Sequence, residues 1–195
     1  MFERRITKVK LTKENFLDVC YKESVGSDEP KDDQVDRKGS HEVHPDLLEK
    51  LKSLRIHLAT MCDEGEYTDF EDNPEKLDIF SVTGYTFGGE DNTHGVTLIG
   101  QKLLKNNKVL NLIPPFVKLN PSESDYSFVT SLAESLVEAD VEADAYVAGK
   151  FAPMRQLSLF DQAPSEDEEA DGEEETERPA KRQRQRKLKE ESEAA

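Results

Sequence analysis

The sequence contains little of what marks a secreted or membrane-spanning protein. Its two cysteines, Cys20 and Cys62, among 195 residues are too few for the disulfide scaffold of a secreted domain. No apolar run approaches the ~18 residues that a membrane-spanning helix needs. The N-terminus leads into a polar, alternating segment instead of the apolar core of a signal peptide. These absences predict a cytoplasmic protein with reduced thiols and no membrane partner.

Acidic residues outnumber basic ones by 42 to 26, which gives a formal net charge of −16. The charged fraction of 35% exceeds the ~25% of an average soluble protein, so part of the chain is predicted to lie outside any packed core. An acidic balance of this size excludes strong, non-specific binding to DNA by charge alone.

A local basic surface remains compatible with this balance. Basic residues gather near the N-terminus, at Arg4, Arg5, Lys8, Lys10 and Lys13, and again at Lys102, Lys105 and Lys108. The second group flanks an expected hairpin turn, which makes it a candidate for nucleic-acid contacts. The alternative is that these side chains are solvated at strand edges, where lysine discourages aggregation.

The first half of the chain combines strands, loops and one helix. Imperfect apolar–polar alternation in residues 5–22 predicts two strands. Glycine, proline and many charges in residues 23–43 predict a mobile loop. Apolar residues at three- and four-residue spacing predict one helix over 45–62, with Pro45 in its first turn. The acidic, irregular residues 63–76 predict a second mobile loop.

The second half of the chain is predicted to form three further strands and a helix. Residues 78–87, 95–103 and 109–113 alternate as strands of a meander, with a tight turn at 105–108 in which asparagine can adopt a positive φ. Residues 123–148 carry a helical apolar stripe. That stripe includes Tyr126, Val129, Leu132, Leu136, Val137, Val141 and Tyr146.

Two local signals predict where the third strand of the meander ends and where the second helix begins. Pro114 and Pro115 cannot donate to a strand ladder, so the third strand of the meander ends there or lies at a sheet edge, and it resumes at Phe116. Ser122 and Asp125 have the spacing of a weak capping box, which predicts the start of the second helix.

Together these elements predict an α+β domain over residues 1–150. Its mainly antiparallel sheet has about five strands, and both helices pack on one face. Residues 151–162 form a linker, and residues 163–195 form a tail with nine acidic residues in 166–177 and seven basic residues in 178–189. Nothing in that tail offsets the entropy of ordering, so it is predicted to be disordered.

The body of the chain shows no motif of an enzyme. It lacks a phosphate-binding glycine loop, a nucleophile elbow and a zinc-protease helix, so we predict no catalytic residue and no cofactor. The four histidines and two cysteines have no zinc-ligand spacing. The acidic groups within residues 63–72 leave a Mg²⁺-dependent nuclease open, although solvated charge explains them better.

The informative motif is Gln156-Leu157-Ser158-Leu159-Phe160. It resembles, without a substitution, the QL(S/D)LF peptides by which bacterial polymerases and repair proteins bind the β sliding clamp. The resemblance implies that Gln156 makes polar contacts at the rim of the clamp pocket. It also implies that Leu159 and Phe160 fill that pocket, while Leu157 and Ser158 shape the extended backbone. The alternative is a final strand that packs on the domain.

The remaining signals concern the setting in which the protein works. Four basic residues of the tail, Lys181, Arg182, Arg184 and Arg186, could contact DNA beside a clamp, and they also fit a loose nuclear-import pattern or a solubilising tail. The stretch from Phe80 to Leu112 resembles uncharacterised phage proteins encoded among replication genes.

The sequence therefore favours a replication or recombination accessory protein of a bacterium or phage. We expect it to be tethered to the clamp and to bind single-stranded DNA on its sheet, through Lys102, Lys105, Lys108 and a Tyr or Phe platform. A recruited nuclease and an inhibitor of clamp-dependent host replication are the alternatives.

Overall fold

The computed structural model describes residues 4–25, 31–89 and 95–153. The first half of the chain holds β1 (Arg4–Leu11), β2 (Leu17–Val25), β3 (Lys31–Arg37), α1 (Pro45–Ser53), α2 (Arg55–Met61), α3 (Tyr67–Asp72) and the 3-10 helix η1 (Pro74–Ile79). The second half holds β4 (Phe80–Gly88), β5 (Gly95–Leu103), β6 (Val109–Leu112), β7 (Val117–Lys118) and α4 (Val129–Val147).

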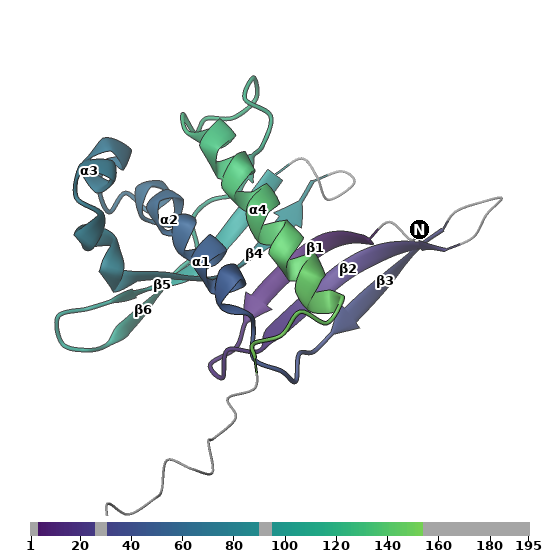
Figure 1. Ribbon diagram of the computed structural model, residues 1–195. Coiled ribbons are helices and arrows are strands. Elements are labelled where there is room, and N and C mark those ends of the chain that lie inside the picture. The colour runs from purple at the N-terminus through teal and green to yellow at the C-terminus, as the bar shows by residue number, and fades with distance from the viewer. Residues whose placement is uncertain (1–3, 26–30, 90–94, 154–195) are drawn as a thin grey trace, which may run out of the picture. The chain divides into compact units, whose positions relative to one another are not determined.

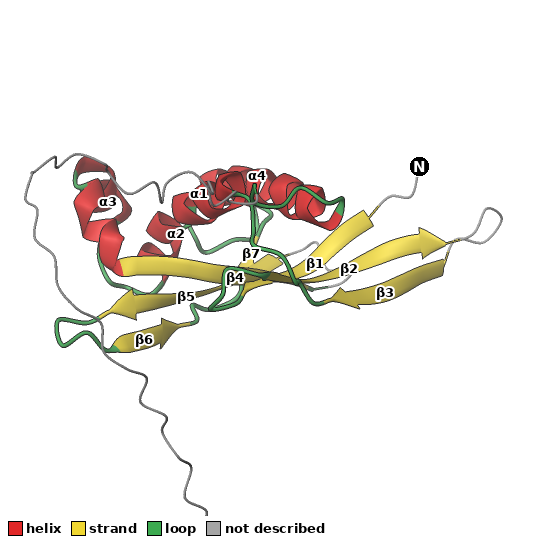
Figure 2. Ribbon diagram, turned by 60° about the horizontal axis from the view of Figure 1, so that its bottom comes forward, coloured by secondary structure: helices red, strands yellow, loops and turns green. Residues whose placement is uncertain are grey.

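The described strands form one antiparallel sheet in the order β3-β2-β1-β4-β5-β6, with β7 also paired to β5. All the helices lie on one side of this sheet, with α4 running across the strands (Figures 1 and 2). None of the described helices lies on the other side of the sheet (Figure 2). The predicted α+β class, with an antiparallel sheet covered on one face, is confirmed.

Alternation along the strands sends apolar side chains to the covered face. In β1, Val9 is fully buried between the exposed Lys8 and Lys10, and a bulge between Ile6 and Lys8 keeps Ile6 on the buried side as well. Leu98 of β5 is also fully buried. Because successive side chains of a strand point to opposite faces, one face becomes apolar and the other polar.

The helices differ from their predicted bounds. One helix over 45–62 was expected, but the chain forms α1 and α2, which meet at the fully buried Leu54. Pro45 begins α1 as predicted, and the side chain of His44 caps it by accepting a hydrogen bond from the Asp46 amide. The break lets both short helices contact the sheet, whereas a straight helix would follow only one line across it.

The prediction of a capping box at Ser122 and Asp125 is wrong. Helix α4 begins at Val129, with Phe128 as its N-cap, because Tyr126 turns towards the core ahead of the helix. Two residues of the expected buried stripe, Val137 and Val141, are 64% and 61% exposed. The helix buries only a narrow face, so the stripe predicted from spacing was too wide.

Both predicted mobile loops contain regular structure. In residues 23–43, β2 runs to Val25 and pairs with β3, which holds only Val35 against the core. In residues 63–76, the buried Phe70 anchors α3, and η1 begins at Pro74. Cross-strand pairing and single aromatic anchors stabilise these segments, and neither leaves a periodic hydrophobic pattern.

The hairpin between β5 and β6 follows its prediction. Asn107 has a φ of 58°, and the Leu104 amide donates to the Lys108 carbonyl at 2.8 Å. This geometry is typical of a three-residue turn that needs one left-handed residue. The prolines at 114 and 115 separate β6 from β7, and both strands pair with the same side of β5, as expected for an edge strand interrupted by proline.

Gly100 sets the approach of the helices to the sheet. A Cβ atom there would collide with the side chain of Leu58 from α2 and with the Ser81 carbonyl. Gly100→Ala is therefore expected to lower the free energy of unfolding by roughly 1–3 kcal/mol, the usual cost of overpacking. Urea denaturation measures this, with Gln101→Ala as the control on the uncovered face, and equal stability of the two variants would contradict the account.

Candidate functional site

The uncovered face of the sheet carries a row of basic side chains from β1 and β2. Arg5, Lys8 and Lys10 of β1 alternate with residues buried under the helices. Lys22 of β2 lies directly across from Arg5. We call these four residues the basic stripe. Because β1 lies between β2 and β4, its lysines do not protect a sheet edge, and that interpretation is wrong for them.

The basic stripe contains a pair of like charges that forms no ion pair with any described residue. Arg5 and Lys22 occupy directly opposed positions, an arrangement that destabilises a sheet unless an anion lies close by. The Nε atom of Arg5 is buried and has no hydrogen-bond partner among the described residues. Further along the strands, Asp18 is opposite Lys10, and Asp36 is opposite Cys20. The stripe therefore has acidic neighbours only along part of its length.

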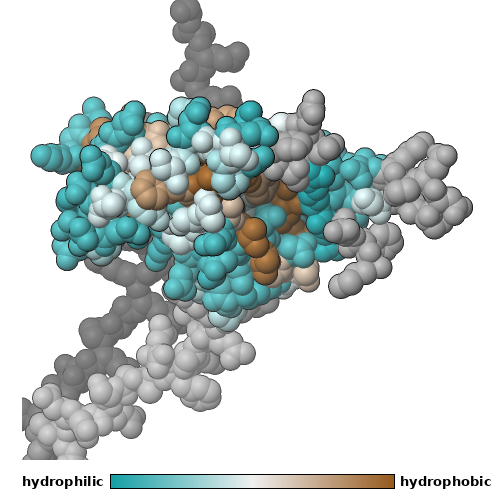
Figure 3. All heavy atoms as spheres, turned by 90° about the horizontal axis from the view of Figure 1, so that it is seen from above, coloured by the Kyte–Doolittle hydropathy of each residue, from teal (hydrophilic) through white to brown (hydrophobic). Residues whose placement is uncertain are grey.

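The two layers of the fold differ in charge. Within the described residues, the seven strands hold nine basic and five acidic side chains, whereas the helices hold four basic and twelve acidic ones. Figure 3 shows one face of the molecule, where hydrophilic residues predominate and hydrophobic ones form small patches. The helical layer therefore repels an anionic ligand more strongly than the strands do.

The three lysines predicted to contact nucleic acid do not share a surface. Lys102 is two and four residues from the buried Gly100 and Leu98, so its side chain shares their face, the covered side of the sheet. There it forms an ion pair with Glu64 and lies 5.5 Å from the centre of the Phe80 ring. Lys105 and Lys108 are exposed in the β5–β6 turn.

The expected aromatic platform is not found on the uncovered face of the described strands. Tyr21, Phe80 and Tyr85 are buried beneath the helices, and Phe87 packs against the same core. Phe116, which is 48% exposed, lies beside Gly88 and Gly95 at one corner. Successive bases cannot stack on a single ring, so this sheet lacks the surface that non-specific single-strand binders use.

The cysteine on the uncovered face is a poor nucleophile. Burial, together with the hydrogen bond and charge of Asp36, raises the pKa of the Cys20 thiol to about 11. Burial also raises the pKa of Cys62. Both thiols remain protonated at neutral pH, and a thiol rather than a thiolate reacts slowly.

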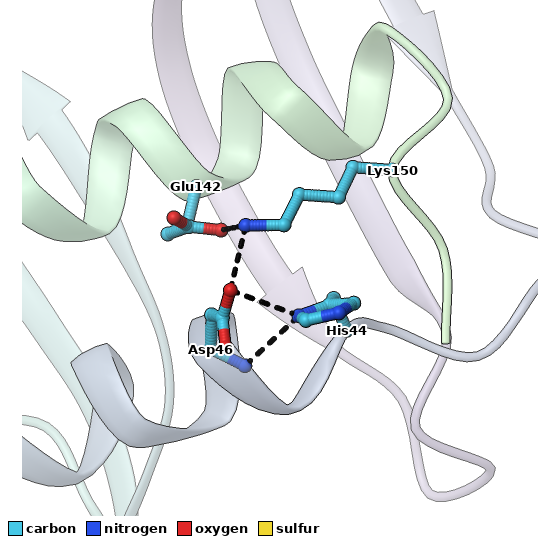
Figure 4. Close-up of polar contacts among 4 residues, drawn as sticks. All are labelled: His44, Asp46, Glu142 and Lys150. Atoms are coloured by element: carbon cyan, nitrogen blue, oxygen red, sulfur yellow. Dashed lines mark hydrogen bonds and ion pairs between the residues drawn. The ribbon is translucent and has the colours of Figure 1, made fainter. Parts of the chain in front are cut away.

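A charged cluster joins the start of α1 to the end of α4 (Figure 4). Lys150 Nζ lies 2.7 Å from both Asp46 Oδ2 and Glu142 Oε2, and His44 Nδ1 lies 3.1 Å from Asp46 Oδ2. The hydrogen bond from Lys150 lowers the pKa of Asp46, and the same bond raises the pKa of Lys150. These groups hold two helices together at the surface, where such pairs contribute little.

Acidic residues expected in a metal-dependent nuclease do not converge within the described part of the chain. No group of three or more His, Cys, Asp or Glu side chains there could hold a metal ion. Glu64 is paired with Lys102, and the acidic residues of α3 lie on a six-residue helix around Phe70. The exposed His41 stacks on Phe151 at 4.3 Å.

Two hollows open on the described surface. A groove of about 1150 Å³ is lined by apolar residues that include Phe16, Leu48 and Phe151. A smaller hollow of about 470 Å³ is lined by Pro115–Lys118, by Asp63 and by Tyr126. Neither hollow contains the basic stripe.

Two partly buried hydrogen bonds join the helices to their surroundings. His57 Nδ1 lies 2.9 Å from the Tyr126 hydroxyl, and burial lowers the pKa of His57 to about 4. The Tyr85 hydroxyl of β4 donates to Asp140 of α4 at 3.0 Å. Burial raises the pKa of Asp140 to about 6. His57 and Tyr85 are buried and their partners Tyr126 and Asp140 are partly buried, so both pairs link elements of the scaffold.

The pentapeptide 156–160 and the basic tail residues Lys181, Arg182, Arg184 and Arg186 lie outside the described residues, as do the packed-strand alternative and the predicted disorder of the tail. In the described segments, no helix is long and apolar enough to cross a membrane. Comparison with known proteins finds no matching family model, curated protein or solved structure.

The buried Asp140 should make stability depend on pH. Its pKa rises from 3.8 to about 6 on folding, so the folded state holds the proton more tightly than the unfolded chain. Stability is then highest below about pH 4 for this group and falls as pH rises to about 6. Asp140→Asn keeps an oxygen for Tyr85 and should remove this fall, stabilising the protein at pH 7 by about 1–3 kcal/mol.

Denaturation at pH 4 and pH 7 measures this difference. The exposed Glu138→Gln in the same helix serves as the control, since its pair with Lys50 lies at the surface. The same pH dependence in wild type and Asp140→Asn would contradict the role of Asp140.

Proposed function

We propose that this chain is a non-enzymatic accessory protein of DNA replication or recombination, tethered to the bacterial β sliding clamp by residues 156–160. The observation that carries the proposal is the uninterrupted match of Gln156-Leu157-Ser158-Leu159-Phe160 to the clamp-binding peptides. Peptides of this kind bind by placing a few apolar anchors in a preformed pocket. In this chain the anchors are Leu159 and Phe160.

The place of the peptide along the chain supports a short tether. The described domain extends to Pro153, three residues before Gln156. Three extended residues span at most about 10 Å. A clamp that holds the peptide would therefore keep the domain close to the DNA that passes through the clamp. The setting would be the cytoplasm of a bacterium or of a phage-infected host.

We propose further that the domain contacts the DNA backbone through the basic stripe. The unpaired like charges of Arg5 and Lys22 favour an anion between them, and a phosphate is the anion that DNA supplies. The acidic helices would face away from the DNA. Without a row of exposed aromatic rings, the contact is to phosphates rather than to stacked bases, so it would be weak and sensitive to salt. The tether would compensate by raising the local concentration of DNA.

The peptide also fits two other activities, each of which predicts a different result. A nuclease recruited by the clamp would cleave DNA when Mg²⁺ is added. An inhibitor of host replication would be toxic on expression, and deletion of residues 156–160 would relieve the toxicity.

The tether predicts a specific loss of clamp binding. Leu159→Ala combined with Phe160→Ala should reduce affinity for purified β clamp at least about 100-fold, because the two anchors of a hot spot are removed. Surface plasmon resonance measures this. Leu188→Ala, which removes another apolar side chain of the tail, is the matched control and should bind like wild type. A double variant that still binds the clamp with wild-type affinity would refute the tether.

The basic stripe predicts which lysines matter for DNA. Replacing Lys8 and Lys10 with glutamine should remove about two phosphate contacts and reduce the salt dependence of binding accordingly. Replacing Lys105 and Lys108 in the same way removes equal charge from the turn and should change little. Fluorescence anisotropy with a single-stranded oligonucleotide at several salt concentrations measures both, with and without Mg²⁺. Greater loss in the Lys105 and Lys108 variant would contradict this surface.

A further inference from the structure

The two edges of the sheet are built differently. Five of the seven residues of β3 are charged, and charged edge strands resist pairing with other chains. Strand β6 at the opposite edge reads Val-Leu-Asn-Leu and has no charge. Its first two side chains, Val109 and Leu110, are 55% and 45% exposed. Only one edge is therefore protected.

Exposed apolar side chains concentrate at the unprotected edge. Five of the eight large hydrophobic residues that are exposed in the described parts of the chain lie on β6 or next to it, namely Leu103, Val109, Leu110, Ile113 and Phe116. We call this set the apolar edge. Contiguous exposed apolar residues beside an unpaired strand are typical of a surface that binds another chain.

The backbone groups that point outward can be identified from the register. Antiparallel ladders alternate between hydrogen-bonded and non-hydrogen-bonded pairs. The Leu104 amide donates to the Lys108 carbonyl, so alternation makes the pair of Leu103 and Val109 non-hydrogen-bonded, and likewise Gln101 and Asn111. The N–H and C=O groups of Val109 and Asn111 therefore face away from β5. Strand β6 ends at Leu112, and continuing the alternation by one residue would turn those of Ile113 outward as well.

We propose that β6 pairs antiparallel with β6 of a second copy of this chain, about a two-fold axis at Asn111. In this register Asn111 opposes Asn111 of the other copy, and Val109 opposes Ile113. The pairing uses all of the outward-facing groups between the 105–108 turn and Pro114. It covers side chains of the apolar edge on both copies and joins their sheets.

The ends of the edge strand have opposite charges, which suits a second copy. Lys105 and Lys108 at the start of the strand form no ion pair with any described residue. The hollow beyond the other end carries Asp63 and Asp125, together with Lys118, whose charge is paired with Glu123. Antiparallel pairing brings the lysines of each copy towards the acidic end of its partner. A partner without this charge order would lack the match.

The same short strand limits the assembly to two copies. A two-fold contact uses the same patch on both chains and closes on itself. Pro114 and Pro115 cannot donate hydrogen bonds, so pairing stops there, and the charged β3 edges remain as ends. Five paired residues make a small interface, which implies a dimer with an affinity in roughly the micromolar range rather than an obligate one.

Disulfide trapping of the full-length chain tests the register. Cα atoms of a hydrogen-bonded antiparallel pair lie about 5.5 Å apart, within the range that a disulfide spans. Asn111→Cys should therefore give a covalent dimer under mild oxidation. Val109→Cys is the matched control, because Val109 faces Ile113 and not its own copy, and it should remain at the background level that wild type, with Cys20 and Cys62, shows.

Sedimentation tests the association without a crosslink. Wild type should shift from monomer towards dimer between about 1 and 300 µM. Asn111→Pro removes an outward N–H that β5 does not use and should abolish the shift, whereas Asn111→Thr keeps that N–H and should retain it. Circular dichroism shows whether the proline variant is folded. If that variant is unfolded, the comparison of Asn111→Cys with Val109→Cys tests the register.

Each result bears on the interface itself. Wild type that stays monomeric throughout, or equal trapping of Asn111→Cys and Val109→Cys, would overturn the proposal, as would a folded Asn111→Pro variant that still dimerises. The clamp-binding double variant at Leu159 and Phe160 should dimerise normally, so failure of the tether leaves this test intact.

Discussion

The packing of the helices on one face of a single antiparallel sheet is the contact on which the rest of the structure depends. It buries the alternating apolar residues of β1, β4 and β5 against α1, α2 and α4. Gly100 allows this approach because it leaves space for Leu58. Burial of apolar surface supplies the main driving force for folding. The arrangement necessarily leaves one face and two edges of the sheet free.

The free surfaces differ in chemistry, and this difference suggests separate roles. The uncovered face carries the basic stripe, while the helical layer is strongly acidic. The β3 edge is charged and the β6 edge is apolar. Because the net charge is −16, a phosphate group can approach only a small part of the protein surface without repulsion. Location rather than total charge therefore decides which ligands the domain can accept.

The buried polar groups support the scaffold. Tyr85 and Asp140 join sheet to helix, and His57 with Tyr126 joins α2 to the segment before α4. A buried hydrogen-bonded pair fixes the relative position of two elements more specifically than apolar contact does. The surface cluster around Lys150 adds a similar link between α1 and α4, exposed to solvent and correspondingly weaker.

Local patterns determined the class of fold and several of its details. Periodicity identified the α+β class and the meander of β4 to β6. Residue identity predicted a positive φ at an asparagine of the 105–108 turn, which is Asn107, and the break at the proline pair. These features depend on neighbouring residues. The pentapeptide at 156–160 is likewise a property of the sequence, and its role stays a prediction. Strand β3 and the split at Leu54 had no periodic signal, since partners distant in the chain stabilise them.

Tertiary structure alone decided which charged side chains share a surface. Lys102 lies on the covered face of β5, where it pairs with Glu64, whereas Lys105 and Lys108 lie in the exposed turn. Lys22 of β2 and Arg5 of β1, by contrast, are directly opposed on the uncovered face. Sequence distance does not report which face a residue occupies once a bulge shifts the register, as it does after Ile6. The sequence by itself thus determined the class of fold, most of its strands and the motif. Folding determined the basic stripe and the apolar edge, because both depend on register and strand order.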